Sequence, residues 1–196
     1  MKRNVAILVF PEVEVLDFAG PFEVFAVTDE LRGYDTFRTF TVAASQTVLR
    51  ARNGLQVVPD FTLEHCPAPH VLIVPGGIGT RALLHQPALL EWLRVKARQA
   101  ELVMSVCTGA LVLAQIGLLD GLRVTTHHER LDLLAQMAPR AIVDASQRFH
   151  DNGHVLTAAG ISAGIDCSLH VVGRLLGEPA AAATAAYMEY RRIESV

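Results

Sequence analysis

The sequence LVMSVCTGALVLAQ, residues 102–115, joins a short apolar run to a turn of small residues and then to a second apolar run. Residues 102–106 predict a buried strand and residues 110–116 predict a helix, so only three residues connect the two. A turn this tight pushes its central residue towards positive φ, and it needs small neighbours such as Ser105 and Gly109. The pattern therefore predicts a nucleophile elbow with Cys107 at its tip.

An elbow of this kind gives Cys107 a reactive environment. It presents Sγ at the carboxyl edge of the sheet, which is where open α/β folds bind ligands. It also places the thiol at a helix N-terminus, where the dipole and the free N–H groups favour the thiolate that attacks carbon electrophiles. The alternative is a buried structural cysteine that happens to end a strand.

The rest of the chain alternates short apolar strands with helices. This alternation predicts one α/β domain over residues 1–196, a three-layer α/β/α sandwich with a mainly parallel central sheet. Strands are predicted at residues 5–10, 37–44, 55–59, 71–74, 102–106, 123–126, 148–150 and 154–158. Helices are predicted at residues 22–28, 87–98, 110–116, 131–137, 163–176 and 180–191.

Composition argues against several classes of partner. Of the 196 residues 51% are apolar, and the net charge of −3 comes from interleaved acids and bases. A basic stripe is missing, so nucleic-acid binding is not expected. No run approaches the ~20 apolar residues of a membrane span, and no signal peptide is recognisable, so a cytoplasmic protein with a small-molecule partner is predicted.

The cysteines and histidines lack the spacing of a metal site or a disulfide framework. Cys167 lies mid-helix and is interpreted as core, whereas Cys66 beside Pro67 has no assigned role. The eight histidines are scattered without matching ligands, so no metal is predicted. No glycine-rich phosphate motif occurs, so no nucleotide cofactor is implied.

A pair of glycines follows the predicted strand at residues 71–74. Because Gly76 and Gly77 allow close backbone approach, their N–H groups and that of Thr108 could form an oxyanion hole beside Sγ. The same sequence also suits a simple turn.

Two side chains are candidates for handling the proton of Cys107. Asp17 is an isolated carboxylate among apolar residues, where desolvation should raise its pKa and let it share a proton. It could instead only complement a helix N-terminus. His127 follows the predicted strand at residues 123–126 and could point at the same edge of the sheet, although the adjacent His128 leaves the choice open.

Motifs along nearly the whole chain resemble the ThiJ/PfpI superfamily, which has the class I glutamine-amidotransferase-like, flavodoxin-like fold. The chain is most similar to its isocyanide hydratase group and to the domains that precede AraC-type DNA-binding modules. The motifs are LVFPEVEVLDFAGPFEVF (8–25), VPGG (74–77), SVCTGALVLAQIGLLDG (105–121), VTTH (124–127) and AAGISAGIDCSLHVV (158–172).

The resemblance implies roles for individual residues. Cys107 would be the nucleophile and Asp17 its hydrogen-bonded acid/base, with Gly77 and Thr108 as backbone donors. Ile161 would start the helix that packs near the cysteine. The resemblance also implies a homodimer.

Two departures narrow the function. The His-x-Glu motif of glutamine amidotransferases is missing, so glutaminase activity is not expected. The chain ends shortly after Tyr190, which leaves no room for a helix-turn-helix module and argues against a stand-alone AraC-type regulator.

Three hypotheses for Cys107 remain open. The first is hydration of an isocyanide to an N-substituted formamide, a lyase reaction with Asp17 as acid/base. The second is glyoxalase III-like or deglycase-like chemistry on 2-oxoaldehydes, in which His127 would take part. The third is a redox or small-molecule sensor without turnover, because an exposed low-pKa thiol is readily oxidised.

Overall fold

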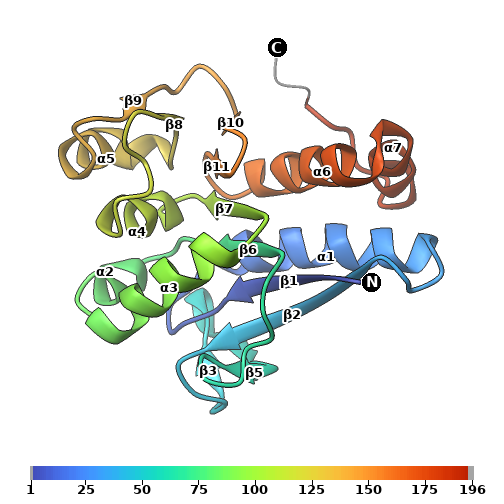
Figure 1. The fold of residues 1–196 in the computed structure, drawn as a ribbon, viewed down its shortest axis with the longest axis horizontal. Coiled ribbons are helices and arrows are strands. Elements are labelled where there is room, and N and C mark those ends of the chain that lie inside the picture. Colours follow the sequence, from blue (N-terminus) through green and yellow to red (C-terminus); the bar gives the residue numbers. More distant parts are fainter. Residues whose placement is uncertain (1, 194–196) are drawn as a thin grey trace.

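A seven-stranded sheet runs through the middle of the computed structural model, which describes residues 2–193 (Figure 1). Its strands are β1 (Arg3–Leu8), β2 (Phe37–Ala43), β5 (Phe61–Thr62), β6 (Val71–Val74), β7 (Leu102–Val106), β10 (Phe149–Asp151) and β11 (Val155–Ala158). They lie in the order β10-β11-β7-β6-β1-β2-β5. Neighbours are parallel except for the antiparallel pair β10 and β11, which form a hairpin around Asn152 and Gly153.

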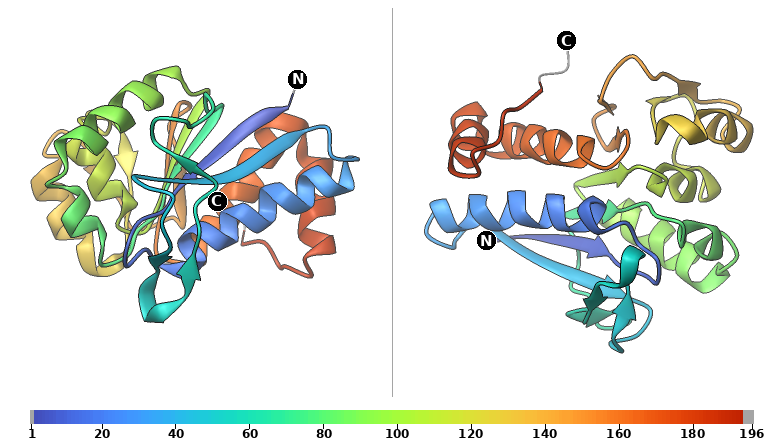
Figure 2. Two further views of the ribbon diagram at one scale, coloured as in Figure 1. Left: turned by 90° about the horizontal axis from the view of Figure 1, so that it is seen from below. Right: turned by 180° about the vertical axis from the view of Figure 1, so that it is seen from behind.

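Helices cover both faces of this sheet, which confirms the three-layer architecture (Figure 2). One face carries α1 (Val15–Leu31), α6 (Ala163–Leu176) and α7 (Glu178–Tyr187). The other carries α2 (Thr80–Leu83), α3 (Pro87–Gln99), α4 (Gly109–Gln115) and α5 (Leu131–Met137). None of the helices within residues 2–193 is long and apolar enough to cross a membrane.

The central strands form the core between these layers. Every residue of β6 and of β7 is buried, as expected for parallel strands that are covered on both faces. The carboxyl ends of β1, β6 and β7 are adjacent in this sheet, so the loops that follow them meet at one edge. The loops after β6 and β7 contain the Gly76-Gly77 pair and Cys107, and Asp17 lies in the first turn of α1, directly after the loop that follows β1.

The first helix begins earlier than the sequence predicts. A helix was expected from Phe22, with Pro21 in its first turn, but α1 already begins at Val15 and contains Pro21. The small residue before Pro21 explains part of this, since a Cβ on Gly20 would lie 3.0 Å from Ile165 in α6. Tight packing of α1 on α6 therefore stabilises a helix that proline would otherwise disfavour, and it moves Asp17 into the first helical turn.

Two predicted strands lie outside the main sheet. Residues 55–59 contribute only β4 (Gln56–Val57), which pairs with β3 (Leu49–Arg50). Residues 123–126 contribute only β8 (Arg123–Val124), which pairs with β9 (Ile142–Val143). The last helix was predicted at residues 180–191, but α7 spans Glu178–Tyr187. The short elements α2 and β5 were not predicted.

Candidate active site

The backbone around Cys107 has the geometry that the sequence predicts. β7 ends one residue before it, α4 begins two residues after it, and Cys107 has a φ of 55°. Its N–H donates to the carbonyl oxygens of Ala158 (3.1 Å) and Ala159 (3.0 Å) at the end of β11. Its own carbonyl accepts a 2.7 Å hydrogen bond from the hydroxyl of Thr126. These contacts fix the left-handed conformation, which costs free energy in a residue other than glycine.

Small side chains allow the turn to pack tightly, as the pattern around Cys107 suggests. A Cβ on Gly109 would lie 2.0 Å from the carbonyl oxygen of Val74, so any larger residue would push α4 away from β6. This close contact explains the glycine that follows Thr108.

Two features around the Cys107 sulfur oppose its ionisation and three favour it. Burial, and then the neighbouring carboxylate of Asp17, raise the pKa of Cys107 to about 12. The N–H groups of Thr108 and Ile161 donate hydrogen bonds to the sulfur and lower its pKa, as does the Thr108 side chain. The two N–H groups are therefore in place to stabilise a thiolate once the negative charge of Asp17 is removed.

Asp17 lies fully buried in the first turn of α1. Burial raises its pKa to about 7, and the charge of Glu14 adds to this, while a hydrogen bond from the Gly76 N–H opposes it. That bond is 2.9 Å long and ends on Oδ2. The Cys107 thiol also lowers the pKa of Asp17, although among the described residues no donor reaches full hydrogen-bond geometry at Oδ1. Asp17 and Cys107 therefore titrate as a coupled pair.

The glycine pair makes different contacts from the oxyanion hole that the sequence suggests. The Gly76 N–H is bonded to Asp17, and the Gly77 N–H donates to Thr108 Oγ1 at 3.0 Å. Thr108 Oγ1 in turn donates to the Gly77 carbonyl at 3.2 Å. Neither glycine N–H is free for an oxyanion in this arrangement, and the donors that face the sulfur are those of Thr108 and Ile161.

Ile161 lies in the turn between β11 and α6, two residues before the helix rather than at its start. Its φ of 47° is an outlier for a β-branched residue. The N–H of this strained residue is the one that donates to the Cys107 sulfur. Strain of this type is commonly found at functional sites, where surrounding contacts compensate for it.

His127 lines the same cavity as Cys107 but is held by other neighbours. Its Nδ1 accepts a hydrogen bond from the Glu129 N–H at 3.3 Å, and its ring centroid lies 4.3 Å from that of His128. Burial, followed by the charge of His128, lowers the pKa of His127. Within residues 2–193 its ring makes no hydrogen bond to Cys107 or Asp17.

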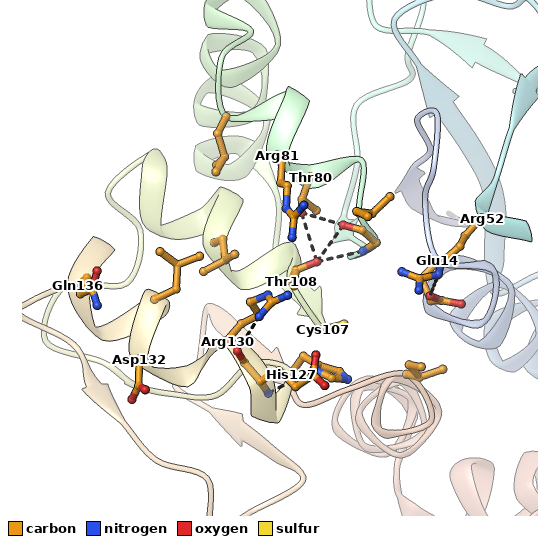
Figure 3. Close-up of a pocket in the computed structure, with 17 residues that line it drawn as sticks. Glu14, Arg52, Thr80, Arg81, Cys107, Thr108, His127, Arg130, Asp132 and Gln136 are labelled. Atoms are coloured by element: carbon orange, nitrogen blue, oxygen red, sulfur yellow. Dashed lines mark hydrogen bonds and ion pairs between the residues drawn. The ribbon is translucent and has the colours of Figure 1, made fainter.

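A cavity of about 830 Å³ opens over the Cys107 thiol (Figure 3). Its charged lining includes Glu14, Arg52, Arg81 and Arg130, and Arg52 pairs with Glu14 at 3.5 Å. Its apolar lining includes Ile78, Leu84, Leu111, Leu133 and Ile161. Glu14, Thr126, Arg81 and Arg130 are not predicted from the sequence as site residues. Glu14 and Thr126 lie within quoted motifs that assign them no role, and the two arginines lie outside every motif, so only the packing of distant segments brings these side chains to the site.

The other two cysteines lie outside this cavity. Cys167 is fully buried in α6, where burial raises its pKa. Burial also raises the pKa of Cys66, whose thiol donates to the Pro67 carbonyl at 3.3 Å. Among the described residues, no group of three or more His, Cys, Asp or Glu side chains is arranged to bind a metal ion.

Comparisons with known proteins match this arrangement of elements. Residues 3–174 match the model of the DJ-1/PfpI family. The isonitrile hydratase of Pseudomonas putida is 36% identical, and the match covers 97% of this chain and 79% of the hydratase. The crystal structure of a ThiJ/PfpI family protein from Pseudomonas syringae superposes with a TM-score of 0.88 at 30% identity, covering 99% of this chain and 77% of that chain.

A regulator is also similar to this chain. The HTH-type transcriptional regulator GbdR of Pseudomonas aeruginosa is 28% identical over 98% of this chain. The chain spans only 52% of that regulator's length.

Proposed function

This chain belongs to the DJ-1/PfpI family, and we propose that it is a cysteine-dependent hydratase that converts an isocyanide into an N-substituted formamide. Cys107 is the nucleophile and Asp17 is the acid/base. Thr108 and Ile161 donate backbone hydrogen bonds to the sulfur. The 36% identity to isonitrile hydratase supports this choice of substrate.

The first half of the reaction begins with one proton shared by Asp17 and Cys107. The thiolate attacks the terminal carbon of the isocyanide and forms the S–C bond, and the Asp17 carboxyl delivers its proton to that carbon. The product is a thioimidate on Cys107, with Asp17 now ionised.

The second half adds water and regenerates the pair. Asp17 accepts a proton from water as the oxygen attacks the thioimidate carbon, and it passes this proton to the nitrogen. The tetrahedral intermediate then loses its hydroxyl proton to Asp17 as the C–S bond breaks. The products are the formamide and a thiolate beside a protonated carboxyl, which is the starting state.

The observation that carries this proposal is the buried pair itself. A carboxyl with a pKa of about 7 can both donate and accept a proton near neutral pH. It lies beside a thiol that opens onto a cavity, and two N–H groups already face the sulfur.

The experiment is to incubate the protein with an aryl isocyanide and to measure formamide by liquid chromatography. The wild-type protein should turn over, Cys107→Ala should show only the uncatalysed rate, and Asp17→Asn should lose roughly 100-fold or more. Cys66→Ala is the matched control and should retain full activity. A wild-type rate no higher than that of Cys107→Ala would overturn the proposal.

A second candidate is the conversion of a 2-oxoaldehyde and one water molecule to a 2-hydroxy acid. The observation in its favour is His127, whose lowered pKa leaves it neutral at pH 7 and able to accept a proton at the cavity wall. A methylglyoxal-to-lactate assay, run beside the isocyanide assay with His127→Gln, separates the two activities.

The similarity to a transcriptional regulator supports a third candidate, a sensor that uses Cys107 without turnover. Such a protein would gain two oxygens at Cys107 under mild peroxide, measurable by intact mass, and would convert neither substrate.

The proposed enzyme works as a cytoplasmic homodimer. Light scattering tests its oligomeric state, and cell fractionation tests its location.

A further inference from the structure

Two arginines line the Cys107 cavity without an acidic partner. Arg81 follows the Gly76-Gly77 turn in α2, and Arg130 ends the single helical turn before α5. Within residues 2–193 neither forms an ion pair, and the only hydrogen bond of the Arg130 side chain, at 2.9 Å, goes to the backbone carbonyl of Glu129. Both guanidinium groups extend into the cavity towards Thr108 (Figure 3).

Three carboxylates, those of Glu14, Glu129 and Asp132, line the same cavity, but among the described residues none forms an ion pair with Arg81 or Arg130. Glu14 is already paired with Arg52. Asp132 points away from Cys107 (Figure 3), and Glu129 is close enough to His127 to raise that residue's pKa. Arg81 and Arg130 are therefore available to an anionic ligand, and a guanidinium presents paired N–H donors that match a carboxylate.

The cavity has room for an occupant that extends well beyond the reacting carbon. An isocyano group contains only two heavy atoms, whereas about 830 Å³ falls in the range that accommodates a drug-sized ligand. Apolar side chains such as Leu84, Leu111 and Leu133 also line the cavity. The complementary ligand has an electrophilic carbon, an apolar part and an anionic group.

We infer that the substrate of this site carries a carboxylate, which Arg81 and Arg130 bind while the electrophilic carbon meets Cys107. The identity of the reacting group rests on the function proposed above. The carboxylate rests on the two arginines alone, so the two claims can be tested separately.

The test uses alkylation of Cys107 by 4-(chloromethyl)benzoate and by its neutral analogue 4-(chloromethyl)benzamide. In both reactions the sulfur displaces chloride, forming one S–C bond as the C–Cl bond breaks, so no turnover is required. The measured quantity is the ratio of the two rate constants, acid over amide, followed by intact mass and compared with the same ratio for 2-mercaptoethanol. Any general loss of thiol reactivity in a variant cancels in this ratio.

The ratio for the wild-type protein should exceed that of the free thiol by about ten-fold, because charge-assisted pairing concentrates the acid beside the sulfur. In Arg81→Gln/Arg130→Gln the ratio should return to the free-thiol value, whereas Arg81→Lys/Arg130→Lys should keep most of it. Arg98→Gln, on an exposed site of α3, is the matched control and should match the wild type. A wild-type ratio equal to that of the free thiol overturns the inference, and so does a raised ratio that survives the double glutamine substitution.

A turnover arm then joins the inference to the proposed function. The kcat/KM for 4-isocyanobenzoate should exceed that for 4-isocyanobenzamide, and the double glutamine variant should lose this preference through KM. Absence of hydration with both isocyanides, beside a raised alkylation ratio, would reject the hydratase and leave the carboxylate site standing. Hydration of both isocyanides at equal kcat/KM, together with an alkylation ratio equal to that of 2-mercaptoethanol, would support the hydratase and reject the carboxylate site.

Discussion

Asp17 and Cys107 differ from an ordinary acid and thiol because burial raises the pKa of both. The first proton leaves the pair with a pKa of about 7 and the second with a pKa of about 12. Between these values the pair carries one negative charge, which a proton transfer moves between oxygen and sulfur. The N–H groups of Thr108 and Ile161 favour the form with the charge on sulfur.

This coupling predicts how the reactivity of Cys107 depends on pH. Below pH 7 both groups are protonated and no thiolate exists, so alkylation by iodoacetamide should rise through a midpoint near pH 7 and then level off. Asp17→Asn should lose this step and react only at alkaline pH. Rates are followed by the mass of the modified protein, with Cys107→Ser as the blank. A midpoint near 8.5 in the wild type, as for a free thiol, would contradict the coupling.

The same carboxyl predicts a pH dependence of stability. Because the folded pKa of Asp17 lies above its unfolded value, its stabilising contribution is present below about pH 4 and is lost as the pH rises through 7. Asp17→Asn cannot ionise and keeps an oxygen for the Gly76 N–H. The free energy of unfolding of this variant relative to wild type should therefore increase by on the order of 2 kcal/mol between pH 5 and pH 8.

Urea unfolding of both proteins at the two pH values measures this difference. If the difference is the same at pH 5 and at pH 8, Asp17 titrates as an exposed carboxylate and its burial does not control its charge.

At the scale of elements, three loops hold the candidate site together. The β1–α1 loop bonds to the β6–α2 turn through Glu14 N–H and Gly76 O at 2.9 Å. The same turn receives Thr108 from the β7–α4 loop. The close approach depends on Gly76, where a Cβ would lie 2.5 Å from Thr108 N and 2.9 Å from Asp17 Oδ2.

Gly76→Ala should therefore disturb both Asp17 and Thr108. Because backbone atoms cannot move aside as a flexible side chain can, we expect a loss of about 2–3 kcal/mol of stability. Alkylation of Cys107 by iodoacetamide should slow at least several-fold. Urea unfolding and mass measurement check the two effects.

Gly173→Ala is the matched control, since the nearest atom to its new Cβ is the end of the Glu178 side chain at 2.9 Å. Gly173 lies in the last turn of α6, where alanine gains up to about 0.5–1 kcal/mol of helix propensity over glycine. Stability should stay the same or rise, with unchanged alkylation. Equal behaviour of the two alanine variants would show that the loop contact at Gly76 is not tight.

The elements themselves differ in how well the sequence predicts them. The strands β1, β6 and β7 are apolar on both faces and bounded by turn residues, so their positions were predicted to within two residues. The predicted start of α1 was wrong. Proline is a strong local signal for the first turn of a helix, and a sequence window does not contain the packing of Gly20 against α6. Two-residue strands such as β8 form by pairing with distant segments, and a sequence window does not contain that information.

At the scale of the whole molecule, the C-terminal segment is fastened to α6 through Asp166. This carboxylate is almost fully buried, and it accepts hydrogen bonds from Arg148 Nε (2.8 Å), Tyr190 OH (3.1 Å) and the Ile193 N–H (3.0 Å). Burial, and then the charge of Asp166, raise the pKa of Tyr190. The cluster joins β10, α6 and the segment after α7.

Removing the cation from this cluster should destabilise the protein more than removing the phenol. Arg148→Met leaves a buried carboxylate without its ion pair and should cost about 2 kcal/mol, after allowance for the partly exposed arginine. Tyr190→Phe should cost about 1 kcal/mol. Urea unfolding compares both with Arg98→Met, an exposed control expected within about 0.5 kcal/mol of wild type. If all three variants lost the same free energy of unfolding, the Asp166 cluster would not contribute to stability.

Only part of the candidate site could be predicted from the sequence, because the rest depends on how segments far apart in the chain pack together. Cys107 and Asp17 lie in local sequence patterns, and these patterns predict the tight turn at Cys107 and the apolar surroundings of Asp17. The N–H of Ile161 and the guanidinium groups of Arg81 and Arg130 reach the cavity only because distant segments pack together, and the hydroxyl of Thr126 reaches the Cys107 carbonyl for the same reason. The N–H groups of Gly76 and Gly77 illustrate the same limit, since their positions were predicted but their bonding partners were not.

The bonds that join the three loops also have a consequence for how this protein can vary. Asp17, Gly76 and Thr108 each contact another member of the set, so the effect of changing one depends on what occupies the other two. Substitutions here should show strong epistasis, with double variants departing from the sum of their single effects. A new specificity is then more accessible through the cavity wall, where Arg81 and Arg130 stand apart from this set, than through the loops that surround the thiol.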